Sequence, residues 1–536
     1  MSRKALVSSC CFLLLFLAGR VAGADVVIDW NNVALNAIRV DKTAPPKASR
    51  ALACVHVAMF DAINSVTGGA YEPYLVEPVN FFAPVSPEAA GAAAAHLALT
   101  ELFPAQAATF DAALATSLAA LPDGPEKTSG VDWGKSVARQ ILDSRHDDGS
   151  TSVVAYEAPG GANWWARTPP AFADPLLPNW PYVKPWAMSR PDQFRQDAPP
   201  APTSAEYTRA FREVKRLGRA TSSSRTAEQS QIALFWADGP GTATPPGHWN
   251  VIAQNLAEAK GNSLIENARL FALVGIATAD AAVVAWDHKY HYSNWRPVTG
   301  IQHADTDGNP ETSADPNWAP FIATPPFPSY TSGHSTFSSA SAKILELFFG
   351  TDAIAFTTTS DALPGVERSF DHLSEAAEEA GQSRIYGGIH WQFDNQVGLA
   401  TGRSLGEHVF FNFLTRVAAA GSCVSGSTAL CLENGRFKVE ARWNTGSASG
   451  SAHAMSLGDD SGRFWFFDED NTELTVKVLD ACEAFDRYWV FASGLTDVEV
   501  LITVTDTQKG RTRQYFNPRG KAFAPVQDTQ AFATCP

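Results

Sequence analysis

The sequence predicts a mainly helical protein, a helical bundle followed by a small C-terminal antiparallel β module. From residue 25 to about residue 420, Ala-rich segments alternate with Pro/Gly-rich loops, and no strand–helix alternation interrupts them. After residue 423, apolar residues recur at every second position, which is typical of half-buried strands. Hydrophobic residues make up 45% of the 536 residues and charged residues 18%, as in globular proteins. We therefore expect a helical domain at residues 25–420 and a β-rich module at residues 423–536.

Residues 1–24 have the pattern of a secretory signal peptide. Arg3 and Lys4 form a positive n-region, residues 5–18 are apolar, and residues 22–24 are small enough for cleavage by signal peptidase. The apolar run is too short to span a membrane. We therefore expect an exported protein, periplasmic or extracellular, with no integral membrane segment after the signal is removed.

The helical region contains several predicted helices in order. The Ala-rich ones are expected at residues 48–65, 87–99, 106–121, 132–142 and 252–260. Another should begin at Thr203-Ser204-Ala205-Glu206, which has N-cap chemistry after a Pro run. Residues 271–295 suit a buried helix, and residues 336–349 suit a helix that follows a Pro/Gly-rich loop.

The β module is predicted from alternation at residues 437–443, 474–478 and 498–504, with turns rich in Gly, Asp, Asn and Ser. This pattern favours a sandwich.

The cysteines divide into two groups. Cys54 lies in an apolar, Ala-rich stretch, and we expect a buried free thiol there. Four others fall near the C-terminus, where export permits two disulfides with three possible pairings: Cys423, Cys431, Cys482 and Cys535.

The overall charge limits the partners. The chain has 56 acidic residues against 41 Lys and Arg, a net charge of −15. This excess argues against nucleic acid and anionic membranes as main partners. An anion must therefore be attracted by a local cationic pocket.

The first of three motifs with chemical content spans residues 286–297. Lys289 and Arg296 are seven residues apart, so on one helix they would share a face. Pro297 is predicted to end that helix at Arg296. A solvated charged face is the alternative, although the surrounding aromatic residues argue against it.

The second motif, residues 325–335, is a Pro/Gly-rich loop that leads into a helix. Free backbone N–H groups at a helix N-terminus bind anions, and Gly333 permits close approach. His334 would transfer protons there. The alternative is an ordinary capped helix with a surface histidine.

The third motif spans residues 383–394. Arg384 and His390 are six residues apart and would not share a helix face, but Gly387-Gly388 permits a break between them. Asp394 follows His390 by four residues and would accept its Nδ1 proton, leaving Nε2 free as nucleophile or ligand. A core histidine beside a carboxylate is the alternative.

Together the motifs predict one site. Lys289, Arg296 and Arg384 with helix N–H groups would bind a tetrahedral oxyanion, phosphate or vanadate, since burying three cations without an anion is costly. His390 would face the central atom, and His334 would handle protons on the other side.

These motifs, Lys-x6-Arg-Pro, Ser-Gly-His and Ser-Arg-x5-His-x3-Asp, resemble those of the vanadium-dependent haloperoxidase and type-2 phosphatidic acid phosphatase (PAP2) superfamily. The chain is most similar to secreted bacterial relatives of vanadium chloroperoxidase, over roughly residues 25–415. Residues 192–195 and 233–239 also resemble segments of these relatives. Thr331 is a departure, because the family usually has proline before Ser-Gly-His. The resemblance implies a helical bundle of this type.

The resemblance also implies roles for individual residues. Vanadate would be held by Lys289, Arg296, Ser332, Gly333 and Arg384. His390 would be the vanadium ligand and His334 the acid–base group, while Asp238 would pair with a cation of the site. Trp286 and Phe327 match the aromatic positions on the halide side.

The activity implied by this branch is a haloperoxidase that uses hydrogen peroxide, a halide and a small organic acceptor. The alternative is a PAP2-type acid phosphatase, with phosphate in the site, His390 as nucleophile and His334 as general acid. A third hypothesis is an exported binding protein with a vestigial site, docked through its β module.

Overall fold

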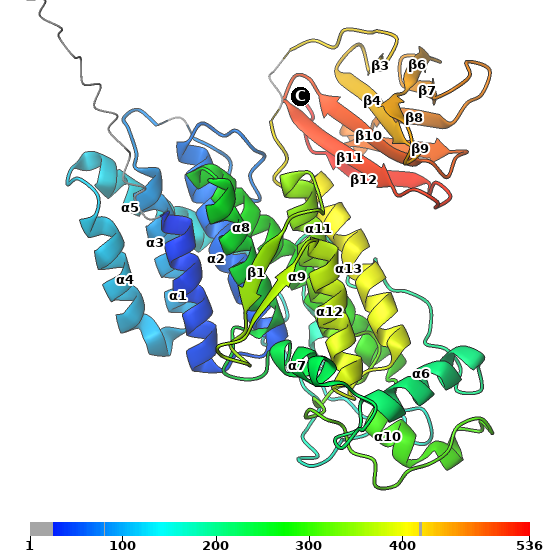
Figure 1. Ribbon diagram of the computed structural model, residues 1–536. Helices are drawn as coiled ribbons and strands as arrows, with labels where there is room; N and C mark the ends of the chain where they lie inside the picture. The colour runs from blue at the N-terminus through cyan, green and yellow to red at the C-terminus, as the bar shows by residue number, and fades with distance from the viewer. Residues whose placement is uncertain (1–24, 80, 418–420) are drawn as a thin grey trace, which may run out of the picture.

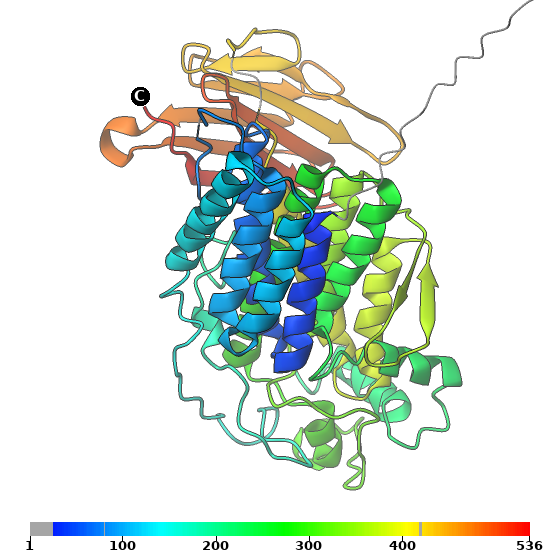
Figure 2. The same ribbon diagram turned by 90° about the vertical axis from the view of Figure 1, so that its left-hand side faces the viewer.

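The computed structural model describes residues 25–79, 81–417 and 421–536, so the predicted signal peptide lies outside the described residues. A body of long helices makes up one part, and a pair of β-sheets lies at one end of it (Figure 1). Figure 2 shows the long helices of the body lying side by side.

The helices of the body include all those that the Ala-rich segments predict. They are α1 (Val26–Asp41), α2 (Pro45–Val66), α3 (Pro87–Leu102), α4 (Ala107–Ala119), α5 (Pro125–Ser144), α6 (Ala205–Leu217), α7 (Ala227–Phe235), α8 (Thr244–Lys260), α9 (Leu264–Tyr292), α10 (Pro297–Gln302), α11 (Gly333–Phe349), α12 (Leu373–Tyr386) and α13 (Gln392–Asn412). Helix α8 begins eight residues earlier than predicted, because Pro245 and Pro246 occupy its first turn, where their missing N–H groups are not needed.

Helix α9 is the central helix, and it packs against α2, α11 and α13. Small residues permit close packing: a Cβ on Gly275 would lie only 3.0 Å from the Cα of Ala53. Within the described residues, α9 is the one helix long and apolar enough to cross a membrane, and 94% of its most apolar window is buried. Such burial is typical of a core helix.

A short hairpin, β1 (Phe356–Thr359) and β2 (Glu367–Phe370), crosses the body, and no sequence pattern predicted it. Each strand has four residues, too few for a clear apolar alternation.

The C-terminal part contains two five-stranded antiparallel sheets with one shared apolar core. The strands are β3 (Ala429–Leu432), β4 (Phe437–Asn444), β5 (Ser449–Ser451), β6 (His453–Ser456), β7 (Ser461–Trp465), β8 (Leu474–Asp480), β9 (Tyr488–Gly494), β10 (Glu499–Asp506), β11 (Arg511–Asn517) and β12 (Val526–Phe532), with the short helix α14 (Cys482–Phe485) between β8 and β9. One sheet has the order β11-β10-β4-β3, with β5 beside β4, and the other has the order β12-β9-β8-β7-β6. The predicted sandwich is present, but the description of a mainly helical protein with a small β module holds only roughly, because this part has two sheets of five strands each.

Two disulfides connect the C-terminal cysteines, Cys423 with Cys431 and Cys482 with Cys535. This selects one of the three predicted pairings. Cys54 is buried and free, as predicted.

The sandwich rests on the body through β11. Phe516 stacks on Phe411 of α13 with ring centroids 5.4 Å apart. Arg513 pairs with the buried Glu72 at 3.1 Å, and Arg511 pairs with Glu77 at 2.6 Å.

Candidate active site

Lys289 lies in the last turn of α9 and is completely buried. Its ammonium group donates hydrogen bonds to three carbonyls of the loop before α11, those of Pro328 at 3.3 Å, Ser329 at 3.1 Å and Thr331. Burial lowers the pKa of Lys289 well below its usual value, and the charge of Arg296 lowers it further. The loop therefore fixes this cation, and a nearby anion would stabilise it.

Arg296 joins the site by another route than the predicted one. The prediction that Lys289 and Arg296 share a face of one helix is wrong, because α9 ends at Tyr292 with Ser293 in the left-handed region at φ 46°. Arg296 is the N-cap of α10, in extended backbone. Pro297 therefore begins the next helix, where its lack of an N–H costs nothing, instead of ending the previous one.

The buried guanidinium of Arg296 contacts both other motifs. It donates to the carbonyl of Phe327 at 2.8 Å, to the carbonyl of Ile389 at 2.7 Å and to Nε2 of His390 at 3.0 Å. Burial lowers its pKa to about 9. The side chain of Arg296, from the first motif, thus connects the second motif with the third.

The second motif caps α11, which begins at Gly333, three residues before the predicted start. The hydroxyl of the buried Ser332 accepts a hydrogen bond from the N–H of Ser335 at 3.3 Å. A Cβ on Gly333 would lie 3.6 Å from the side chains of Trp286 and Phe337, which is ordinary van der Waals contact. The first N–H groups of a helix have no partner within it and can bind an anion.

The predicted break in the third motif is present. Helix α12 ends at Tyr386, Gly388 adopts φ 80°, and α13 begins six residues after α12 ends. A Cβ on Gly388 would lie 2.2 Å from the carbonyl oxygen of Gly218, so only glycine fits this turn. On the α12 side, Arg384 is buried and donates to the carbonyl of Trp236 at 2.8 Å.

His390 and Asp394 form a buried pair at the start of α13. Nδ1 of His390 lies 2.8 Å from Oδ2 of Asp394. The same oxygen accepts from the N–H of Trp391 at 3.0 Å and from the hydroxyl of Ser329. His390 precedes the helix instead of sharing its face, and Asp394 in the first turn reaches back to it.

Burial shifts the pKa values of this pair, and hydrogen bonding sets which nitrogen of His390 carries the proton. Burial, followed by the charges of Arg296, Lys289 and Arg384, lowers the pKa of His390 well below its usual value. Burial raises the pKa of Asp394 to about 6. Because Nε2 of His390 accepts from Arg296, the proton of the neutral ring lies on Nδ1 and is donated to Asp394.

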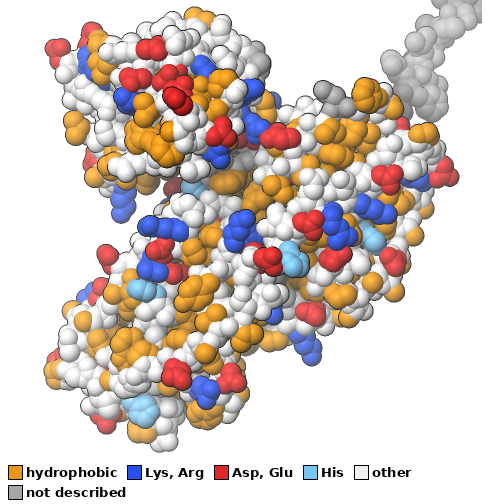
Figure 3. Space-filling view, turned by 180° about the vertical axis from the view of Figure 1, so that it is seen from behind, with side chains coloured by type: hydrophobic (Ala, Val, Ile, Leu, Met, Phe, Trp, Pro, Cys, Tyr) orange, Lys and Arg blue, Asp and Glu red, His pale blue; other side chains and the backbone are white. Residues whose placement is uncertain are grey.

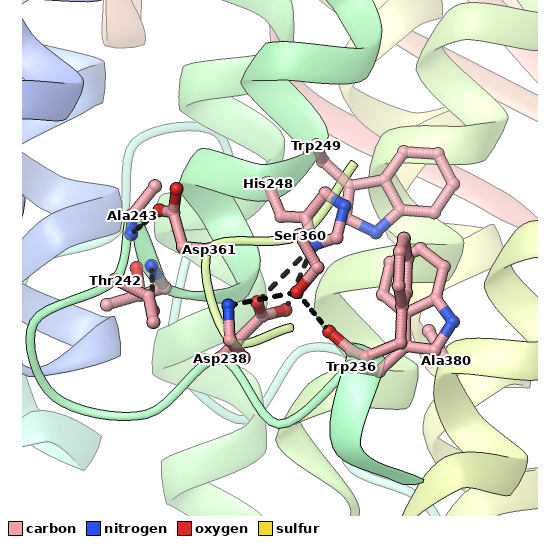
Figure 4. A network of polar contacts seen from close by, with 12 residues as sticks. Trp236, Asp238, Thr242, Ala243, His248, Trp249, Ser360, Asp361 and Ala380 are labelled. Atoms are coloured by element: carbon pink, nitrogen blue, oxygen red, sulfur yellow. Dashed lines mark hydrogen bonds and ion pairs between the residues drawn. The ribbon is translucent and has the colours of Figure 1, made fainter. Parts of the chain in front are cut away.

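Asp238 lies in the polar network of Figure 4, together with His248 and Trp236. Its two carboxylate oxygens each lie 3.3 Å from Nδ1 of His248, whose ring stacks on Trp236 with centroids 4.6 Å apart. Its charge also raises the pKa of Arg384, which burial lowers to about 10. The direct partner of Asp238 is thus His248, while its attraction to a site cation acts through space.

His334 follows Gly333 and is partly buried. Its Nε2 has no hydrogen-bond partner among the described residues. Burial lowers its pKa well below the usual value, and the charge of Arg384 lowers it further. This ring is therefore neutral and available as a proton acceptor.

Trp286 and Phe327 form an aromatic wall, with ring centroids 5.0 Å apart. The ammonium of Lys289 lies 5.0 Å from the centroid of Phe327, and the guanidinium of Arg296 lies 4.8 Å from it. The wall excludes water beside two cations and so strengthens their interaction with an anion.

Ser329 and His248 were missed by sequence reasoning. Ser329 stands inside the second motif, but its partner Asp394 is 65 residues away. His248 follows Asp238 by ten residues, across a loop that belongs to no recognised motif. The one available signal was that Ser329 is a polar residue inside the second motif.

Comparisons with known proteins agree with this geometry. Residues 269–419 match the family model of the VCPO second helical-bundle domain. The vanadium chloroperoxidase of Curvularia inaequalis is 27% identical over 493 residues, which cover 69% of this chain and 79% of that protein. The crystal structure of the first bacterial vanadium-dependent iodoperoxidase matches with a TM-score of 0.64 and 27% identity, over 73% of this chain and 96% of that one.

A holo-type bacterial vanadium-dependent chloroperoxidase matches with a TM-score of 0.55 over 69% of this chain and 92% of that one, and at 18% identity this likeness concerns the fold. The matched residues 269–419 include all three motifs. The chain is therefore similar in sequence and fold to vanadium-dependent haloperoxidases.

Proposed function

We propose that the protein is a vanadate-dependent haloperoxidase that oxidises halide with hydrogen peroxide to hypohalous acid. The observation that carries the proposal is the convergence of three buried cations on His390. Lys289, Arg296 and Arg384 each lower the pKa of that imidazole, and all three are at least 95% buried. Two carboxylates, Asp394 and Asp238, face these three cations, so a further anion would stabilise the cluster.

The unpaired polar atoms of the site, two donors and one imidazole nitrogen, fit a tetrahedral oxyanion. Among the described residues, Nη2 of Arg296, Nε of Arg384 and Nε2 of His334 are buried without a hydrogen-bond partner. Buried polar atoms normally have partners, so these point to a ligand. We assign the oxygens of vanadate to Lys289, Arg296, Ser332, Gly333 and Arg384, and the vanadium to Nε2 of His390.

Bound vanadate would supply the Lewis acidity that activates peroxide toward halide. The residues of the chain would supply proton transfer, charge stabilisation and exclusion of water. His334 would accept a peroxide proton at Nε2, and Lys289 would stabilise the negative charge that develops beside it. Trp286 and Phe327 would keep water from the halide side. The hypohalous acid would then halogenate a small organic acceptor.

The test is halogenation of a phenol by purified protein with peroxide and bromide, before and after vanadate is added. We expect activity that depends on vanadate and falls at least ~100-fold in His390→Ala and Lys289→Ala. Lys47→Ala, at an exposed position of α2, is the control for substitution of a lysine.

A phosphatase is the outcome that would contradict this proposal. The same donors would hold phosphate, and His390 would attack phosphorus while His334 protonates the leaving group. Hydrolysis of a chromogenic phosphate ester, inhibited by vanadate and without any halogenation, would assign the site to that reaction.

We also propose that the protein is exported to the periplasm or the extracellular space. Two disulfides in the β module support this, because such bonds persist in oxidising compartments.

A further inference from the structure

A cleft separates part of the β sandwich from the helical body. Figure 3 shows the molecule hollowed there, with Lys and Arg side chains on both sides of the hollow. It contains a cavity of 690 Å³ and a neighbouring one of 420 Å³. Six residues line both, so the two cavities form one groove: Lys343, Glu346, Arg403, Glu407, Pro518 and Arg519.

The register of the sheet explains why the cleft is wedge-shaped. Phe516, Leu501, Arg442 and Ser451 lie opposite one another across β11, β10, β4 and β5. At one end of this row, Phe516 stacks on Phe411 of α13 and closes the wedge. The other members line the larger cavity, so the groove opens beneath β10, β4 and β5. The roof of the groove thus combines the apolar side chains of Phe516 and Leu501 with the cation of Arg442.

Three of the four acidic side chains that line the groove have partners, and the fourth, the exposed Glu378, has none among the described residues. Lys343 pairs with Glu346 at 2.6 Å and with Glu407 at 3.8 Å. Glu499 accepts a hydrogen bond from Asn444 at 3.0 Å. Burial raises the pKa of Glu407 to about 7, so this carboxyl contributes only part of a negative charge at neutral pH.

Apart from Lys343, the cations of the groove lack such partners. Within the described part of the chain, none of Arg403, Arg442, Arg519 and Lys521 forms an ion pair, and the guanidinium of Arg519 donates to the carbonyl of Thr445 at 3.2 Å. Four unpaired cations lining one groove are notable in a chain whose net charge is −15. The charge of the groove therefore complements an anion that the rest of the surface would repel.

We propose that this groove binds an acidic polysaccharide, whose carboxylate or sulfate groups contact Arg403, Arg442, Arg519 and Lys521. The continuous length of the two cavities suits an extended chain, and Leu347, Leu501 and Phe516 offer apolar surface to sugar rings. The disulfides of the module favour an extracellular polymer over nucleic acid. The groove belongs to neither the vanadate site nor its supporting residues.

The experiment is calorimetric titration of the full mature protein, without vanadate, with four polymers of similar length. Polygalacturonate carries carboxylates, dextran sulfate carries sulfates, dextran is neutral, and polyglutamate is an acidic peptide. We expect binding of one or both acidic polysaccharides that weakens at least ~tenfold between about 50 and 300 mM salt. Absence of binding, equal binding of dextran, or equally tight binding of polyglutamate would overturn the proposal.

The variant Arg403→Glu with Arg442→Glu should weaken binding of the acidic polysaccharide at least tenfold. The matched control, Lys47→Glu with Lys135→Glu, changes the net charge equally at exposed positions outside the groove and should leave affinity within twofold. Arg403→Gln with Arg442→Gln avoids new charge beside Glu407, in case the first variant does not fold. Equal loss in the control and groove variants would show that general charge, not this groove, attracts the polymer.

Discussion

At the scale of single residues, the carboxylate of Asp394 determines how His390 presents its lone pair. Its Oδ2 accepts hydrogen bonds from Ser329, His390 and Trp391, while its buried Oδ1 has no partner within the described residues. With a pKa of about 6, the carboxyl is ionised at neutral pH and holds the histidine proton at Nδ1. Nε2 is then left as an acceptor that faces Arg296.

Replacement of Ser329 should weaken this arrangement. Ser329→Ala removes one donor to Asp394, and we expect oxyanion affinity to fall about fivefold to tenfold, which corresponds to about 1 kcal/mol for one hydrogen bond. Titration calorimetry with vanadate, and separately with phosphate, measures it. Ser65→Ala, which removes a buried hydroxyl from α2, should leave the affinity unchanged. An equal effect in both variants would show that Ser329 acts only through stability.

The raised pKa of Asp394 also predicts a pH dependence. As the pH falls through about 6, the carboxyl takes up a proton and loses an acceptor for His390. We therefore expect the affinity of the wild type, relative to that of Asp394→Asn, to fall between about pH 7.5 and pH 5. Taking the ratio at each pH removes the titration of the oxyanion itself. A ratio that does not change with pH would contradict the role of ionised Asp394 in oxyanion binding.

At the scale of elements, turns were predictable where glycine marked them and not elsewhere. The Gly387-Gly388 pair correctly indicated the break between α12 and α13. No glycine marks the end of α9 at Tyr292. Ser293 adopts a left-handed conformation there, which is uncommon for serine and could not be predicted from the residue type. The three motifs and the contact of His390 with Asp394 were therefore predictable from the sequence. Contacts such as that of Ser329 with Asp394 were not, because the partners come from distant segments.

The α12–α13 turn allows a paired test with two glycines of similar backbone conformation. Gly388 and Gly365 have φ values of 80° and 83°, but only Gly388 is crowded, because a Cβ there would lie 2.2 Å from the Gly218 carbonyl oxygen. Gly388→Ala should destabilise the protein by more than about 2 kcal/mol and weaken oxyanion binding. Gly365→Ala should cost only about 1 kcal/mol. Chemical denaturation and calorimetry would compare them, and similar costs would argue against the crowding.

At the scale of the whole molecule, the helical body and the β sandwich have separate apolar cores. The contacts between them include the stacked pair Phe411–Phe516, the ion pairs of Glu72 and Glu77, and a hydrogen bond from the N–H of Thr512 to Glu72. The exposed pair of Arg511 with Glu77 contributes little to stability, so the pair at the buried Glu72 is the stronger of the two. The two parts should therefore unfold in separate steps.

The disulfides should affect only one of these steps. They close segments of 53 residues (Cys482–Cys535) and 8 residues (Cys423–Cys431). Replacing both cysteines of the longer one by serine should destabilise the sandwich by about 4 kcal/mol, against about 2.5 kcal/mol for the shorter one. Differential scanning calorimetry should show one transition moving while the transition of the helical body stays in place. A single transition that moves as a whole would show that the cores are coupled.

The buried carboxylate of Asp280 has a consequence for the export that we propose. In the folded protein, it accepts three backbone N–H groups, those of Trp186, Ala187 and Met188. It also lies near the middle of α9, the helix apolar enough to resemble a membrane span. An aspartate at the centre of a bilayer costs about 3 kcal/mol. For a chain in transit through a translocation channel, Asp280 would thus oppose lateral escape into lipid, and the same group later anchors a loop of the finished enzyme.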